Sequence, residues 1–326
     1  MPGEFRFYTA PNGLASPILR LRITEAGVVD IIRNINMRDS FTANDGVLTK
    51  EGIRFLHNFG NNNTFLGSAA GNTTMTSAAN NIGVGTRSLQ NIFTANGNVA
   101  LGVDSLLNLS SGAINTAVGF SSLESSISNN ANTGVGYLAL AGVNTGNFNT
   151  AVGARTGIGL SSAQDVTLVG YEATALNGAS NVTSIGSGAF CNANNQITLG
   201  DALVTTLRCA TTTITAISDR REKKNILPIA LGLDFIRRLK PVKFHRIHQQ
   251  DDEPKTYGLI AQDVIEALHE VGEPFETFAG VSYDSVHDRY ELRFGEFQMI
   301  ALKAIQELAE KVMVLEKEVA SLRAGK

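Results

Sequence analysis

The chain has 326 residues, a formal net charge of −3 at pH 7, 17% charged residues and two cysteines. This length allows two or three domains, and so small a net charge argues against a nucleic-acid partner or a charged membrane surface. Two cysteines cannot form a disulfide framework, and no apolar run is long enough for membrane insertion. The five histidines lack metal-ligand spacing, so we predict no metal site and no cofactor.

Residues 1–60 predict a small β-rich leader. Residues 4–8 largely alternate between apolar and polar side chains and residues 19–23 do so strictly, which is typical of strands with one buried face. Turns are expected at Pro11-Asn12-Gly13 and Glu25-Ala26-Gly27. Such a leader either attaches the chain to a larger particle or caps the segment that follows it.

Residues 61–217 repeat a short unit, Asn-Thr-x-Val-Gly, and carry few charges. The clearest copies are residues 63–67, 81–85, 98–102, 115–119, 132–136 and 149–153, and weaker copies end at Gly170, Gly186 and Gly200. Successive glycines are 18, 17, 17, 17, 17, 17, 16 and 14 residues apart. So regular a period predicts a repeat fold. Four units also place a leucine four residues after the glycine: Leu89, Leu106, Leu123 and Leu140.

The period is too short for two helices and suits two short strands joined by turns. In residues 115–119, Thr116 and Val118 share one face of a strand, and the other face carries only small side chains and an asparagine. Burial of the two large apolar side chains of one coil is worth much less than the conformational entropy lost in ordering that coil. We therefore expect stacking between coils and burial between chains, in an obligate oligomer.

The array resembles the left-handed β-roll heads of trimeric autotransporter adhesins and similar repeats in viral and phage fibres. The Asn-Thr-x-Val-Gly unit carries this resemblance over about 140 residues and departs from the adhesin pattern in unit length and in asparagine content. Near-identical repeats allow three chains to pair one coil out of step at little cost, so a distinctive trimeric domain at one end is expected. The β-branched residues of 201–217 predict the last strands before that domain.

At residue 218 the composition changes to a charged, helix-forming sequence. The change begins with Ser218-Asp219-Arg220-Arg221-Glu222-Lys223-Lys224-Asn225-Ile226. This stretch resembles the Ser-Asp-x-Arg-x-Lys-x-Asn-Ile signature of the auto-processing intramolecular chaperone peptidases, found at the C-termini of phage endosialidases, tail fibres and neck appendages. Residues 240–244 and 257–264 resemble two further blocks of that family, with mild departures at Leu259 and Asp263. The resemblance covers nearly all of residues 218–326.

The resemblance implies a self-cleaving peptidase in which Ser218 is the nucleophile and Lys223 is its general base. Serine reacts only when a neighbour takes its proton, and a lysine does so only when burial or nearby positive charge lowers its pKa from about 10.4. Asp219 would assist or orient the reaction. The expected cut is the Ser218–Asp219 bond, or the Ile217–Ser218 bond through an acyl shift onto the serine hydroxyl. The alternative is a purely structural role, in which the Ser-Asp pair caps a turn or helix and residues 220–224 form a solvated charged face.

Residues 218–326 predict an α+β domain that ends in a coiled coil. Helices are expected at 231–239 and 262–271, and a hairpin is expected around Asp288–Arg289. A long helix at 298–322 carries a seam with 3-4 spacing: Ile305, Leu308, Val312, Leu315, Val319 and Leu322. This pattern alone favours a two-stranded coiled coil, whereas the family that residues 218–326 resemble is trimeric. A single amphipathic surface helix is the alternative.

The sequence thus predicts a mainly β, trimeric fibre followed by an α+β chaperone domain with a trimeric coiled coil. We expect a homotrimeric fibre or adhesin on the virion surface, made in the host cytoplasm, attached through residues 1–60 and facing a host receptor or glycan. Its only enzymatic activity would be one self-cleavage. The alternatives are a fibre that is not cleaved, a glycan-degrading fibre enzyme, for which the leader and array leave no room, and a membrane-tethered regulator.

Overall fold

The computed structural model divides into two compact units, Met1–Leu207 and Arg208–Lys326, and each is described by itself. The residues that the structure describes are 4–9, 18–24, 26–31, 46–204, 206–210, 214–247 and 249–324. The predicted turn at Pro11-Asn12-Gly13 lies outside them, as do Glu25 and Thr211-Thr212-Thr213.

The first unit begins with a three-stranded antiparallel sheet in the order β1 (Phe5–Thr9), β2 (Ile18–Ile23) and β3 (Val29–Ile31). Both predicted strands of the leader are therefore confirmed. The predicted buried face is wrong for β1, which is exposed along its whole length. Alternation in a sequence fixes which side chains share a face of a strand, but another layer must pack on that face to bury it.

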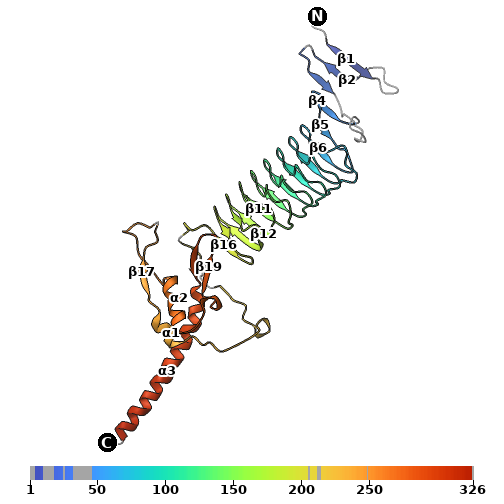
Figure 1. Ribbon diagram of the computed structural model, residues 1–326. Helices are drawn as coiled ribbons and strands as arrows, with labels where there is room; N and C mark the ends of the chain where they lie inside the picture. Colours follow the sequence, from blue (N-terminus) through green and yellow to red (C-terminus); the bar gives the residue numbers. More distant parts are fainter. Residues whose placement is uncertain are drawn as a thin grey trace. The chain divides into compact units, whose positions relative to one another are not determined.

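The repeats form a β-solenoid of about eight coils, as predicted (Figure 1). Each coil places one strand in a single sheet, and neighbouring strands are parallel and in register, so that Thr116 lies opposite Thr133 and Val118 opposite Val135. The parallel strands are β6 (Thr64–Leu66), β7 (Ile82–Val84), β8 (Val99–Leu101), β9 (Thr116–Val118), β10 (Thr133–Val135), β11 (Thr150–Val152), β12 (Gln164–Val169), β14 (Ser180–Ile185) and β16 (Ile197–Leu199).

The prediction of two strands per coil is wrong for most of the solenoid. Only β13 (Thr174–Ala175) and β15 (Phe190–Cys191) form a second parallel sheet among the described residues. Elsewhere the rest of each coil consists of turns whose backbone groups still bond to the next coil, as in the bond from the Leu106 N–H to the Ser122 carbonyl at 3.1 Å. Residues with a left-handed backbone conformation interrupt these segments and prevent a continuous strand.

A hairpin caps the first coil. Strands β4 (Leu48–Lys50) and β5 (Ile53–His57) are antiparallel, and β5 pairs antiparallel with β6. His57 is buried there, with its ring 4.9 Å from that of Phe65 and its Nε2 atom 2.8 Å from the Ala70 carbonyl oxygen. The cap therefore places the His57 ring against Phe65, which lies in the interior of the first coil.

The predicted leucine column fills the solenoid interior. Leu89, Leu106, Leu123 and Leu140 are all fully buried, and each has a positive φ between 50° and 53°. A left-handed conformation costs a leucine about 1–2 kcal/mol, whereas its burial contributes about 1.5–3 kcal/mol. Burial outweighs the backbone cost, so each coil tolerates a tight corner at a residue that is not glycine.

The regular spacing of the glycines has a steric cause, seen at Gly119. Its φ is +130°, and a Cβ atom at this position would overlap the carbonyl oxygen of Gly136 in the next coil. Gly136 stands in the same relation to Gly153. Glycine is thus required at this corner both by the backbone conformation and by the closeness of the coils.

A ladder of buried asparagines joins the coils through their side chains. The Oδ1 atom of Asn98 accepts bonds from the backbone N–H and from the Nδ2 atom of Asn115, both at 2.9 Å. Asn115 Nδ2 also donates to the Asn129 carbonyl oxygen at 2.8 Å, and its Oδ1 accepts from the Asn132 N–H at 3.0 Å. The ladder runs through Asn63, Asn81, Asn98, Asn115, Asn132 and Asn149, all of them buried.

The second unit is an α+β domain, as predicted. After a 3-10 turn, η1 (Arg220–Glu222), come α1 (Leu233–Arg238), β17 (Val242–Phe244), β18 (Thr256–Gly258), α2 (Ala261–Glu270), the 3-10 turn η2 (Phe275–Thr277), β19 (Val281–Asp284), β20 (Arg289–Leu292) and α3 (Phe294–Ala324). Its core packs Phe235 of α1 and Leu268 of α2 against Phe297 and Ile300 of α3. The predicted helices and the hairpin are therefore confirmed.

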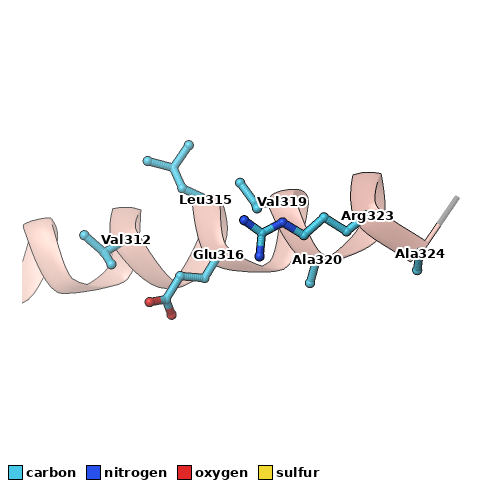
Figure 2. Close-up of a pocket in the computed structure, with 7 residues that line it drawn as sticks. All are labelled: Val312, Leu315, Glu316, Val319, Ala320, Arg323 and Ala324. Carbon is cyan, nitrogen blue, oxygen red and sulfur yellow. The ribbon is translucent and has the colours of Figure 1, made fainter. Parts of the chain in front are cut away.

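The C-terminal half of α3 makes no such core. The predicted seam residues from Ile305 to Leu322 are all exposed in the single chain. Figure 2 shows Val312, Leu315 and Val319 projecting from one stretch of this helix, with Glu316 and Arg323 beside them. The helix is confirmed, and its apolar seam has no cover among the described residues of its own chain.

The predicted strands in residues 201–217 do not form in the part of that segment that the structure describes. Val204, Leu207, Ile214 and Ile217 are exposed and lie outside any strand. β-branched residues favour a strand only where a neighbouring strand supplies hydrogen bonds and a packing face. Here β16 is the last strand of the sheet.

The asparagine ladder predicts a large loss of stability for Asn115→Ala. The change leaves the buried N–H of Asn132 without its acceptor, which costs about 1–3 kcal/mol. Asn91→Ala is the matched control, since the Asn91 side chain bonds to Asn108 at the exposed surface. Denaturant unfolding of both variants measures the difference, and equal losses would contradict a special role for the buried ladder.

Burial holds the pKa of the His57 imidazole below its usual value, and the bond to Ala70 only partly offsets this effect. The unfolded chain therefore takes up a proton near pH 6.5 that the folded cap does not, so the free energy of unfolding falls as the pH drops from 7 to 5. Thermal melts across this range should show that His57→Gln loses part of this dependence. An unchanged pH dependence would show that His57 does not set it.

Candidate functional site

The predicted dyad is assembled by one tight turn at the start of the second unit. The Nζ atom of Lys223 lies 2.6 Å from the Oγ atom of Ser218, within hydrogen-bond distance. Between them η1 reverses the chain, with bonds from the Glu222 N–H to the Asp219 carbonyl oxygen at 3.1 Å and from the Lys223 N–H to the Arg220 carbonyl oxygen at 3.2 Å. The five-residue spacing of serine and lysine thus becomes a direct contact.

Asp219 begins this turn as its N-cap. Its backbone is extended, with φ −66° and ψ 138°, and its Oδ1 atom accepts a bond from the Arg221 N–H at 2.8 Å. An aspartate in this position satisfies a backbone donor that the turn itself leaves free. The sequence alternative, a Ser-Asp pair that caps a turn, is therefore correct for Asp219, and the same turn brings Lys223 to Ser218.

The Asp219 carboxylate is also paired with the Arg221 guanidinium. Nη2 of Arg221 lies 2.7 Å from Oδ2, and Nε lies 3.1 Å from Oδ1 and 3.2 Å from Oδ2. These bonds hold the pKa of the Asp219 carboxyl below its usual value and raise the pKa of Arg221. The pairing of Asp219 with Arg221 was not foreseen from the sequence, where Asp219 was expected to assist or orient the reaction; that role stays a prediction.

The two other blocks that resemble the chaperone family lie side by side. Residues 240–244 contain β17 and residues 257–264 contain the end of β18, and Val242 pairs with Gly258 while Lys243 pairs with Tyr257. Together with the start of α3 they line an apolar pocket, which includes Leu239, Pro241, Leu259, Phe294 and Ala301. The sequence did not predict this pocket, because its walls come from three separate segments between residues 236 and 301.

A second contact that the sequence does not predict joins α3 to the start of α1. Glu307 Oε2 accepts a bond from the Leu233 N–H at 2.7 Å, and this bond lowers the pKa of the Glu307 carboxyl. A carboxylate is favourable at the positive end of a helix. The contact fixes the long helix to the small domain across 74 residues of sequence.

No cluster of three potential metal ligands occurs among the described residues. His245 bonds through Nε2 to the Glu253 carbonyl oxygen, and His287 bonds to Asp284, so both have local structural partners. His248 lies outside the described residues. In the described part of the chain no helix combines the length and the apolar character needed to cross a bilayer.

Residues 218–273 match the family model described as the chaperone of endosialidase, a peptidase family. The match begins at Ser218, the first residue of the dyad, and includes both further blocks. Comparison with curated proteins gave no match, and neither did comparison with solved structures. The chain therefore combines a β-solenoid with an intramolecular-chaperone domain of this kind, the arrangement expected of a tail fibre.

Proposed function

We propose that this chain is a homotrimeric fibre of a virion, whose residues 218–326 align the three chains during folding and are then released by self-cleavage. The observation that carries the proposal is the 2.6 Å contact between Ser218 Oγ and Lys223 Nζ at the first residue of the family match. Residues 1–60 would attach the fibre to the particle, and the solenoid would face a receptor or glycan of the host.

The chemistry starts with proton transfer from Ser218 Oγ to the unprotonated amine of Lys223. Attack of Oγ on the Ile217 carbonyl carbon closes a five-membered ring, breaks the Ile217–Ser218 bond and leaves an ester, and the released Ser218 amine takes up the proton. Water then hydrolyses the ester. Cleavage at Ser218–Asp219 cannot begin by attack of Oγ on its own carbonyl, which would close a strained four-membered ring. That cut needs an activated water or the serine of a neighbouring chain.

Exposed apolar side chains on α3 support association through a coiled coil. Val312 and Val319 at one set of seam positions alternate with Leu315 and Leu322 at the other, and all four are exposed in the single chain. Packing these residues between helices removes them from water. A stoichiometry of three follows the resemblance of residues 218–326 to trimeric chaperones.

The outer face of the solenoid sheet supports packing between copies along the fibre. The strand residues just before the repeat glycines are apolar and partly exposed, as at Leu101, Val152 and Val169. The residues just after these glycines include Phe120, Tyr137 and Tyr171, which are exposed as well. Soluble monomers rarely expose so long a strip of apolar side chains.

The charges beside this strip are paired within the chain. Arg87 of one coil bonds to Asp104 of the next at 2.6 Å and 2.7 Å, and Arg155 bonds to Glu172 of the next coil at 2.5 Å. Pairing between successive coils leaves no unbalanced charge at these positions. A face of this kind suits a second copy of the same chain better than a charged partner.

The proposed cleavage predicts that the wild-type chain yields two fragments on folding, whereas Ser218→Ala and Lys223→Met stay intact. Lys224→Met is the matched control, because it removes the adjacent exposed lysine and keeps the dyad. Intact-mass measurement after refolding reads out the products, and fragment masses that differ by one serine residue distinguish the two scissile bonds. An intact wild-type chain, or rapid cleavage of Lys223→Met, would refute this mechanism.

The proposed coiled coil predicts that Leu315→Asp abolishes the trimer of the Ser218→Ala chain, from which the chaperone segment cannot be released. A buried charge in the seam costs far more than the same charge at the helix surface. Lys317→Asp is the control, since Lys317 is two residues away on the outer side of the helix. Light scattering after gel filtration gives the mass. The proposal fails if the Ser218→Ala chain is itself a monomer.

A further inference from the structure

The turn that carries the Ser218–Lys223 contact also carries a carboxylate, that of Asp219, which is a competing partner for the lysine. Asp219 follows Ser218 directly and precedes Lys223 by four residues, on the same tight turn. An opposite charge within about 4–6 Å favours the protonated form of a lysine. A lysine paired with Asp219 would therefore be a poor acceptor for the serine proton.

Arg221 forms an ion pair with the Asp219 carboxylate in the folded chain. Its guanidinium contacts both Asp219 oxygens, and its backbone N–H donates to one of them, so that the carboxylate points to Arg221. Lys223 instead places its amine on Ser218. Arg221 and Lys223 thus have separate partners.

We propose that Arg221 is a positioning residue for self-cleavage: its guanidinium holds the Asp219 carboxylate away from Lys223 and leaves the Lys223 amine free to accept the proton of Ser218. The inference rests on the proposed self-cleavage. The other charged side chains of the segment are Arg220, Glu222 and Lys224, which are exposed and form no ion pair among the described residues. None of them pairs with the Asp219 carboxylate in place of Arg221.

Stability alone does not explain the pair. The side chain of Arg221 is 87% exposed and that of Asp219 is 40% exposed, and ion pairs so open to water contribute little to folding. The cap bond from the Arg221 N–H to Asp219 needs no guanidinium, and an asparagine caps a turn as well as an aspartate does. Mutation can therefore remove the ion pair of Asp219 and Arg221 while the cap bond from the Arg221 N–H is kept.

The experiment measures the rate of self-cleavage of the full chain against pH for the wild type, Arg221→Gln, Asp219→Asn and the double variant. Arg221→Gln frees the carboxylate, so the rise of the rate should move up by about one pH unit, with about tenfold slower cleavage at neutral pH. The double variant has no carboxylate to restrain, so its profile should coincide with that of Asp219→Asn. Arg220→Gln removes the same charge from the neighbouring position and should leave the profile in place.

Two outcomes would overturn the inference: an Arg221→Gln rate reduced equally at every pH, or a double variant as slow as Arg221→Gln. A second readout needs no cleavage. In the Ser218→Ala chain, acylation of Lys223 by acetic anhydride, followed by peptide mass spectrometry, should slow in Arg221→Gln and recover in the double variant. If the wild type does not cleave, the proposed function fails, while the acylation rates still decide whether Arg221 restrains Asp219.

Discussion

The buried asparagine ladder is the constraint on which the solenoid depends. Each coil is too thin to surround a large apolar core, so polar groups lie in its interior and must be bonded there. Asn115 meets this need with the coils on both sides, since it donates to Asn98 and Asn129 and accepts from Asn132. An asparagine at the same place in each of six successive coils keeps the period nearly constant, and the ladder ends where the Val166 N–H donates to Asn149.

The same regularity removes information about alignment between chains. The outer faces of successive coils are alike too, with an exposed apolar residue before the glycine, as at Leu101, Val152 and Val169, so a shift by one coil between copies would exchange equivalent partners. Alignment must come from elements that occur once. The second unit supplies such an element in α3, which Glu307 fixes to α1. Under the proposed function, the fibre therefore needs the second unit while it assembles, whereas the bonds between finished coils hold each chain together.

Much of this architecture could be predicted because it is local. The glycine period and the alternation around Ala117 follow from spacing alone, and the structure confirms them. It also confirms the helix that carries the seam of α3, while the packing of that seam stays a prediction. The left-handed leucines and the single strand per coil depend on how one coil closes onto the next. In residues 201–217 the β propensity of single residues was misleading, because no neighbouring strand follows β16.

The candidate site likewise contains features that the sequence predicts and features that it does not. Ser218 and Lys223 were identified by a motif, and the structure places them in contact, but the motif gave no partner for Asp219. That partner is Arg221, two residues away, and the link is visible only once η1 has formed. The pocket formed by residues 240–244 and 257–264 with α3 could not be predicted either, since β17 and β18 pair across a loop whose length does not fix its path.

Under the proposed function, the position of the cut has a thermodynamic consequence. Cleavage at residue 218 separates the coils, which bond to one another, from the non-repeating domain that aligns the chains. A released fibre that unfolds has then lost the element that guides its refolding. Its persistence is governed by the rate of unfolding rather than by an equilibrium. Bonds that form late in assembly, between identical coils, slow that unfolding most. A repeated ladder and a single-use chaperone are therefore complementary: the first supplies durability without alignment, and the second supplies alignment without remaining in the product.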